Sequence, residues 1–387
     1  MQEPGLITSE APPFRPNPAP FGIGAAIFVL LFAAGNALGG ELGSLMAASI
    51  NALPFALLAI LAYLAGSRPN WAWLATGLWL SLMVGFASLT TLGLSIASLA
   101  GGDLGSPEAL AAMPSSAWLQ LGVIVLGMLF SVILGGVLLL PAVRRWLARF
   151  LPIDPNSFVH ATALVTVVTI GLICTMPLLV LGEPPLLGLV DQLGGEASGR
   201  SDGGQLRDTL YGLIWTIPAA VLAVGFGITR DLHAARLRLG LVRPTWRQVA
   251  VGIGIALLMA AAVQLLGGAL DWLWTTLGWP TTDEEAFAEL LAYAINPVGA
   301  LVIGISAGLG EELGVRGVLQ PRLGLLLSNL FFVSLHALQY NWDALLIVFL
   351  VGLVCGIVRN RTNTSTAAIV HGVYNFTLIM IATISGV

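Results

Sequence analysis

The chain consists mainly of long apolar stretches that are separated by only a few charged residues. Of its 387 residues, 57% are hydrophobic and only 9% are charged, whereas a soluble domain carries about 25% charged residues. An apolar stretch of about 20 residues can cross a bilayer as a helix, which satisfies its backbone hydrogen bonds within the segment. We therefore predict an all-α, polytopic helical membrane protein.

Apolar stretches of roughly this length occur about eleven times along the chain. The ninth and tenth are short, which indicates a tilted or partly re-entrant pair. We expect transmembrane helices at 21–40, 45–66, 72–100, 118–142, 158–182, 208–228, 248–270, 296–322, 326–340, 344–358 and 365–385.

The basic residues, all of which are arginine, indicate how these helices are oriented. Arginine is enriched in cytoplasmic loops, and most arginines fall there if the N-terminus is cytoplasmic and the C-terminus lies outside. The absence of lysine suggests a GC-rich genome, and we expect a bacterial inner (plasma) membrane as the location. The net charge of −4 does not suggest a nucleic-acid partner.

The chain divides into three regions. Residues 1–20 are polar and rich in proline, which predicts a disordered N-terminal segment. A basic loop at 229–247 separates two membrane regions, and we place a domain boundary near residue 240. We expect a six-helix membrane region of unknown role at 21–240 and a C-terminal domain at 241–387, with its polar motifs within 290–385.

Several ionisable or amide side chains lie inside the apolar stretches of the C-terminal region. Such groups are costly at membrane depth and usually mark function. Two adjacent carboxylates in one span are especially costly, so we expect the whole group to form one active site. Its members are Glu311, Glu312, Arg316, His336, His371 and Asn375.

The spacing of these residues suggests separate roles. Glu312 and Arg316 are four residues apart, so they share a helix face and can form an ion pair that lowers the cost of burying both. Glu311 points about 100° away from Glu312, which leaves its carboxylate free to face a cavity as a general base.

The predicted helices bring three of the ionisable residues to similar depth. Counted from the expected cytoplasmic helix ends at 1.5 Å per residue, His336 lies about 12 Å deep, Glu311 about 16 Å and His371 about 9 Å. Asn375 follows His371 by four residues, and the two can stabilise an oxyanion together. This set predicts hydrolysis of a peptide bond without a nucleophilic Ser or Cys.

The pattern Glu311-Glu312-x-x-x-Arg316, Phe332-x-x-x-His336 and His371-x-x-x-Asn375 resembles the three-motif signature of the CPBP family. These CAAX-prenyl-protease and bacteriocin-processing (Abi) intramembrane endopeptidases are relatives of the Ras-converting endoprotease. The resemblance covers roughly residues 290–385.

The resemblance implies an all-helical fold with an active site in a cavity that opens to the membrane and the cytoplasm. It implies that Glu311 activates water with the help of His336, and that His371 and Asn375 stabilise the oxyanion. Glu312 and Arg316 resemble the supporting pair. The sequence departs from the family at Leu313-Gly314-Val315, which lacks the aromatic residue that often precedes the arginine.

Other interpretations of the same residues stay open. Two histidines and a glutamate also ligate zinc, and a zinc site would use Glu311, His336 and His371. The HExxH spacing is missing, so we favour a metal-free mechanism with no cofactor. Rival functions are a catalytically silent immunity or scaffold protein of the same fold, and a transporter that relays protons through buried Glu and His.

We expect the partners to be a membrane-associated peptide or protein substrate and the lipid bilayer. The oligomeric state is not predicted. The two cysteines, Cys174 and Cys355, lie within apolar runs and are expected to be small buried hydrophobic residues.

Overall fold

The computed structural model describes residues 29–30, 33–35, 37, 39–67, 71–101, 107–190 and 201–386. The predicted disordered segment 1–20 and most of the predicted helix 21–40 lie outside the described residues. Within them the chain is almost entirely helical, with no β-strand. The predicted all-α class is confirmed.

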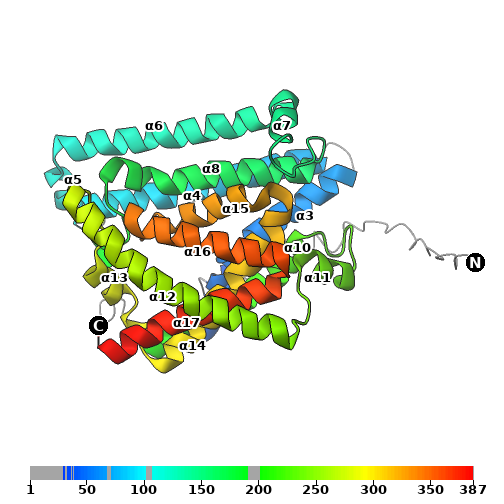
Figure 1. Ribbon diagram of the computed structural model, residues 1–387. Coiled ribbons are helices and arrows are strands. Elements are labelled where there is room, and N and C mark those ends of the chain that lie inside the picture. Colours follow the sequence, from blue (N-terminus) through cyan, green and yellow to red (C-terminus); the bar gives the residue numbers. More distant parts are fainter. Residues whose placement is uncertain are drawn as a thin grey trace, which may run out of the picture.

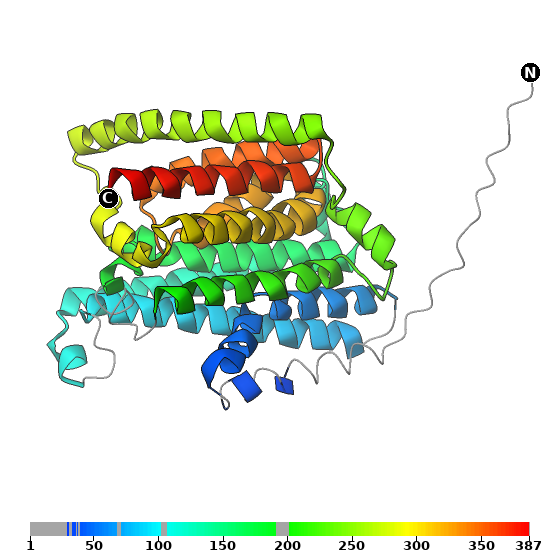
Figure 2. The ribbon, with the colours of Figure 1, turned by 90° about the horizontal axis from the view of Figure 1, so that it is seen from below.

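Most of the long helices run side by side in nearly parallel or antiparallel directions (Figure 1). Seen from below, α12 covers the side of α17, and α3 and α4 lie at the opposite edge (Figure 2). The helices of the first half are α2 (Gly40–Ala47), η1 (Ala48–Asn51), α3 (Leu53–Ser67), α4 (Trp71–Leu99), α5 (Pro107–Ala112), α6 (Ser115–Leu138), α7 (Pro141–Leu147), α8 (Phe158–Leu181), η2 (Leu187–Leu189) and α10 (Asp202–Ala223).

The second half begins with the short helix α11, continues with the 32-residue helix α12, and ends with the 20- and 22-residue helices α16 and α17. Its helices are α11 (Leu232–Leu239), α12 (Trp246–Leu277), α13 (Glu284–Leu290), η4 (Ala292–Ala294), α14 (Pro297–Ile305), η5 (Ser306–Glu311), η6 (Leu313–Leu319), α15 (Gln320–His336), α16 (Trp342–Arg361) and α17 (Thr364–Ser385).

Seven helices of the described chain are long and apolar enough to cross a membrane. The number rises to eight if the bent pair Gly40–Asn51 and Leu53–Gly66 forms one span. The protein is therefore a polytopic integral membrane protein, but the predicted count of eleven is not confirmed. The predicted span 208–228 coincides with α10, which is not among the seven because its first two turns carry Asp202, Arg207 and Asp208.

The chain from Pro297 to His336 counts as one of the seven helices, although the sequence predicts two spans there. The backbone leaves the helical conformation at Gly324, whose φ of 82° favours glycine. This break separates the segments that correspond to the predicted spans 296–322 and 326–340. The next helix, α16, runs from Trp342 to Arg361 and is longer than the predicted 344–358.

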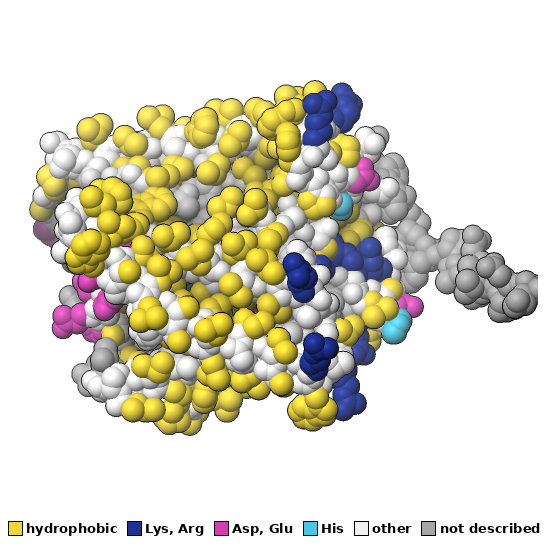
Figure 3. Space-filling model, in the orientation of Figure 1, with side chains coloured by type: hydrophobic (Ala, Val, Ile, Leu, Met, Phe, Trp, Pro, Cys, Tyr) yellow, Lys and Arg dark blue, Asp and Glu magenta, His cyan; other side chains and the backbone are white. Residues whose placement is uncertain are grey.

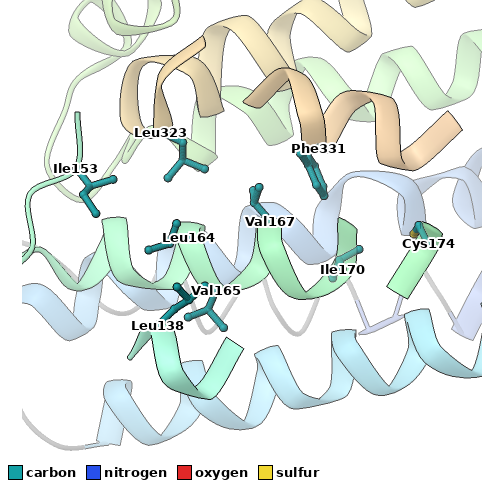
Figure 4. Close-up of a cluster of buried hydrophobic side chains, with 9 residues drawn as sticks. All are labelled: Leu138, Ile153, Leu164, Val165, Val167, Ile170, Cys174, Leu323 and Phe331. Carbon is teal, nitrogen blue, oxygen red and sulfur yellow. The ribbon is translucent and has the colours of Figure 1, made fainter. Parts of the chain in front are cut away.

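The hydrophobic core joins the two halves of the chain. Leu164 and Val167 of α8 belong to one buried cluster with Leu323 and Phe331 of α15. Figure 4 shows that Val165, on the other side of α8, points toward Leu138 of α6. Helix α8 therefore lies between α6 and the C-terminal helices, and its burial on both sides fits its uniformly apolar sequence.

Charged side chains gather at opposite ends of the helices. In Figure 3 the arginines lie at the end where α7 and α11 are found, whereas most acidic side chains lie at the end near α13. The surface between the two ends is largely hydrophobic. This arrangement is expected for helices whose middle portions face lipid.

Three glycines let the backbones of α14, η5 and α17 approach closely. A Cβ added to Gly308 would lie 2.6 Å from the carbonyl oxygen of Ala368, and one added to Gly304 would lie 2.8 Å from that of Gly372. Small residues at such crossings are typical of membrane helices. The contact matters for the site because Gly308 precedes Glu311 by one turn and Gly372 follows His371.

We predict that Gly308→Ala destabilises the protein by about 1–3 kcal/mol, because the added methyl group forces the two backbones apart. The measurement is the thermal unfolding of the purified protein in one detergent. Gly136→Ala on α6 is the matched control, since a Cβ there meets nothing within 4 Å and alanine is the better helix former. Equal unfolding temperatures for the two variants would contradict the close approach.

Candidate active site

The segment that carries the two glutamates is a widened helix rather than a regular α-helix. Ser306–Glu311 and Leu313–Leu319 are both π-helical, and such turns are rare and often found at functional sites. The predicted angle of 100° between Glu311 and Glu312 is that of a regular α-helix, so it does not strictly apply here. The different surroundings of Glu311 and Glu312 nevertheless agree with the predicted division of roles between these two residues.

Glu312 and Arg316 form an ion pair in the interior of the protein. Their side chains are 0% and 1% exposed, and Arg316 Nε lies 3.3 Å from Glu312 Oε2. Arg316 Nη2 donates to the carbonyl oxygen of Gly352, at 2.7 Å, and to Asn329 Oδ1, at 3.4 Å. The arginine therefore links the widened helix to α15 and α16. The sequence predicted the pair but gave no signal for Asn329 or Gly352.

His371 of α17 lies between the two glutamates. Its Nδ1 is 3.0 Å from Glu312 Oε1, and its Nε2 is 3.8 Å from Glu311 Oε2. Because an ionised carboxylate only accepts hydrogen bonds, Nδ1 is the donor to Glu312. Glu311 is 38% exposed at its side chain, so its carboxylate is open to the space in front of His371 while that of Glu312 is closed off behind it.

His336 is positioned by the aromatic residues around it. Its Nδ1 donates a hydrogen bond to the carbonyl oxygen of Phe332, at 2.9 Å. This bond does not involve Nε2, the other ring nitrogen. The imidazole packs edge-on against Phe332, with 4.6 Å between ring centroids, and stacks on Tyr340 at 6.0 Å. The sequence analysis did not single out Tyr340.

Phe332 contacts three of the charged or ionisable groups. Besides His336, its ring packs edge-on against His371, at 6.1 Å, and lies beneath the guanidinium of Arg316, at 5.1 Å from its carbon. A cation over an aromatic face is stabilised by the ring quadrupole. Phe332 thus packs against all three side chains and restricts their orientations.

One cavity of about 1020 Å³ brings the predicted residues together. Glu311, His336, His371 and Asn375 all line it, whereas Glu312 and Arg316 do not. Its remaining wall is mostly apolar and includes Ala59 of α3, Thr166 of α8 and Thr216 of α10, among other residues of these helices. The first half of the chain therefore supplies part of the cavity wall, which the sequence analysis did not foresee. The predicted boundary near residue 240 stays a prediction.

A buried thiol adjoins the site. The side chains of Glu312, Cys355 and His371 have potential metal-binding atoms that lie within 4.8 Å of one another. This group, the one found among the described residues, differs from the zinc set predicted from the sequence, which was Glu311, His336 and His371. Cys355 is a buried free cysteine, as expected, but its place beside Glu312 could not be read from its apolar sequence context.

Comparison with known proteins supports the resemblance seen in the sequence. Residues 294–377 match the family described as Type II CAAX prenyl endopeptidase Rce1-like, and this stretch contains every residue of the three motifs. Neither the curated proteins nor the solved structures gave a match to the chain. The match supports a CAAX-type intramembrane protease fold for the C-terminal region.

We predict that Arg316→Met destabilises the protein by about 3–5 kcal/mol, because it leaves the buried Glu312 carboxylate without its cation. Chemical unfolding of the purified protein measures the effect. The double variant Glu312→Gln/Arg316→Met removes both charges, and its amide oxygen can still accept from His371 Nδ1. It should recover a large part of the lost stability; a double variant no more stable than Arg316→Met would contradict the importance of the buried charge.

Proposed function

We propose that this protein is an intramembrane endopeptidase that hydrolyses a peptide bond of a membrane-associated protein or peptide. The observation that carries the proposal is the cavity that Glu311, His336, His371 and Asn375 share. It places a partly exposed carboxylate, two imidazoles and an amide around one space inside an apolar wall. Its volume of about 1020 Å³ is at the upper end of typical ligand pockets and suits a peptide segment.

In this mechanism Glu311 acts as the general base, assisted by His336. The Glu311 carboxylate takes a proton from water while the water oxygen forms a bond to the carbonyl carbon of the substrate. Its exposure suits the role, because the neighbouring Glu312 is fully enclosed and held by Arg316. The same proton then passes to the amide nitrogen as the C–N bond breaks, which yields a carboxylic acid and an amine. The acid then loses its remaining proton to the amine or to water.

Asn375 and His371 stabilise the oxyanion that forms when water adds to the carbonyl. The Asn375 side-chain amide donates directly. Nδ1 of His371 is held by the Glu312 carboxylate, so the ring donates to the oxyanion from Nε2 when that nitrogen also carries a proton. Glu312 is a positioning residue here because it acts through His371.

We propose that the reaction needs no metal ion and no other cofactor. The group that brings three potential ligands closest, Glu312, Cys355 and His371, includes a carboxylate already paired with Arg316. The positive charge of that guanidinium opposes a divalent cation at the same carboxylate.

Replacing Glu311 tests the proposed activity. Glu311→Gln keeps the shape of the side chain but cannot accept the proton of water, so we expect cleavage of a membrane-anchored peptide to fall by about 10²–10⁴-fold. Cleavage is measured by mass spectrometry with purified protein in vesicles. Glu289→Gln, at an exposed position of α13, is the control and should cleave normally. Unchanged cleavage by Glu311→Gln would rule out the mechanism, and a silent scaffold protein would cleave in neither form.

We also propose that the protein lies in a bacterial inner membrane with the arginine-rich end in the cytoplasm, because arginine is enriched on that side. Ala112 of α5 and Leu237 of α11 are exposed at opposite ends of the molecule. A membrane-impermeant maleimide should label Ala112→Cys in intact cells, but Leu237→Cys only after permeabilisation. The reverse labelling pattern would show that the arginine-rich end lies outside and would contradict the proposed orientation. The native cysteines are buried, which keeps the background low.

A further inference from the structure

Three arginines meet at the C-terminal end of α10, away from the motif residues. Tyr63 Oη accepts from Arg322 Nη2, at 2.7 Å, and from Arg230 Nη1, at 3.2 Å. Both guanidiniums lie near the same phenol ring, 5.8 Å and 6.0 Å from its centroid. Arg238 of α11 donates to the carbonyl oxygen of Gly317, which Pro321 cannot satisfy because it lacks an N–H. We call Arg230, Arg238 and Arg322 the arginine cluster.

Within the part of the chain that the structure describes, the hydrogen bonds of the arginine cluster all end on neutral oxygens. Arg322 also donates to the carbonyl of Ala223, and Arg230 to that of Val224. Among the described residues, no ion pair joins a cluster arginine to a carboxylate. Two acidic residues of neighbouring loops bond to their own backbone. Asp231, which follows Arg230 in the chain, accepts from the N–H of Ala234. Asp154, whose charge acts on His160 together with those of Arg322 and Arg238, accepts from the N–H of Asn156.

The arginines of the cluster are close and buried enough to oppose one another. Arg322 is only 3% exposed. Burial, followed by the positive charges of Arg322, Arg230 and Arg359, lowers the pKa of Arg238 to about 10. Carbonyl groups at the end of α10 offset part of this cost through the helix dipole. A partly buried positive cluster without a carboxylate nevertheless favours binding of an anion.

We propose that the arginine cluster binds the phosphate group of an anionic lipid headgroup. Guanidinium groups bind phosphate through paired, charge-assisted hydrogen bonds, and free phosphate shares this chemistry. The lipid is the favoured source because Arg238 belongs to α11, which lies at the arginine-rich end of the helices (Figures 1 and 3), where headgroups of the adjoining leaflet are found. Arg322 also lines the apolar cavity, so the bound lipid adjoins the space proposed for the substrate.

Native mass spectrometry of the full-length protein tests the site, with phosphatidylglycerol as the anionic lipid and phosphatidylcholine as the zwitterionic one. Arg230→Gln/Arg238→Gln should weaken phosphatidylglycerol binding by roughly 30-fold, since each arginine near a phosphate contributes about fivefold. The matched control is Arg145→Gln/Arg149→Gln, which removes the same charge from exposed positions near α7 and should change binding less than about twofold. Arg230→Gln alone, on a partly exposed side chain, provides a milder variant if the double variant unfolds.

The outcomes distinguish specific lipid binding at the arginine cluster from nonspecific attraction of the lipid to surface charge. Equal losses in the cluster and control variants, or equal binding of the two lipids to the wild type, would overturn the proposal. Selective loss in the cluster variants supports it. Competition with inorganic phosphate then identifies the source: displacement of the lipid indicates a site for any phosphate group, and retention of the lipid assigns the site to the headgroup.

Discussion

The structure depends on the buried contact among Glu312, Arg316 and His371. A carboxylate and a guanidinium in the middle of a helical membrane protein each lose several kcal/mol of hydration free energy. The ion pair, the carbonyl of Gly352 and the imidazole of His371 together compensate for that loss. Because these partners come from three different helices, the compensation exists only when the widened helix, α16 and α17 are packed together. The charge network therefore selects one arrangement of the helices.

Close packing makes this network sterically possible. A Cβ on Gly352 would lie 2.1 Å from Asn329 Oδ1 and 3.0 Å from Arg316 Nη2, so only glycine leaves room for the guanidinium to reach the α16 backbone. An equivalent hydrogen bond forms one turn later, where Gln320 Nε2 donates to the carbonyl of Gly356. Two polar side chains four residues apart, Arg316 and Gln320, thus donate to two glycine carbonyls of α16 that are also four residues apart. Such bonds hold the helix of the glutamates in register with α16.

Much of the fold and part of the site could be predicted from the sequence because both rest on spacing along single helices. The apolar stretches indicate the helices, and the four-residue spacing of Glu312 and Arg316 indicates their pairing. What could not be predicted depends on contacts between distant segments. Nothing in the sequence shows that His371 lies between both glutamates, that Tyr340 stacks on His336, or that Cys355 adjoins Glu312. The π-helical turns also escaped prediction, since a helical period does not reveal its hydrogen-bond pattern.

The sequence leaves the role of the first half of the chain open. In the structure this half supplies part of the cavity wall and a contact to Arg322. Part of the cavity wall is formed by Ala59, Thr166 and Thr216. Tyr63 of α3 accepts a hydrogen bond from Arg322 near the arginine-rich end of the molecule. Arg322 lies ten residues beyond Glu312 and two residues before the break at Gly324, so the contact with Tyr63 fixes the end of the helix that carries both glutamates. Movement of α3 against α10 would therefore change the cavity wall and the support of that helix together. This coupling gives the N-terminal helices a physical connection to the site without placing any of them among the reacting groups.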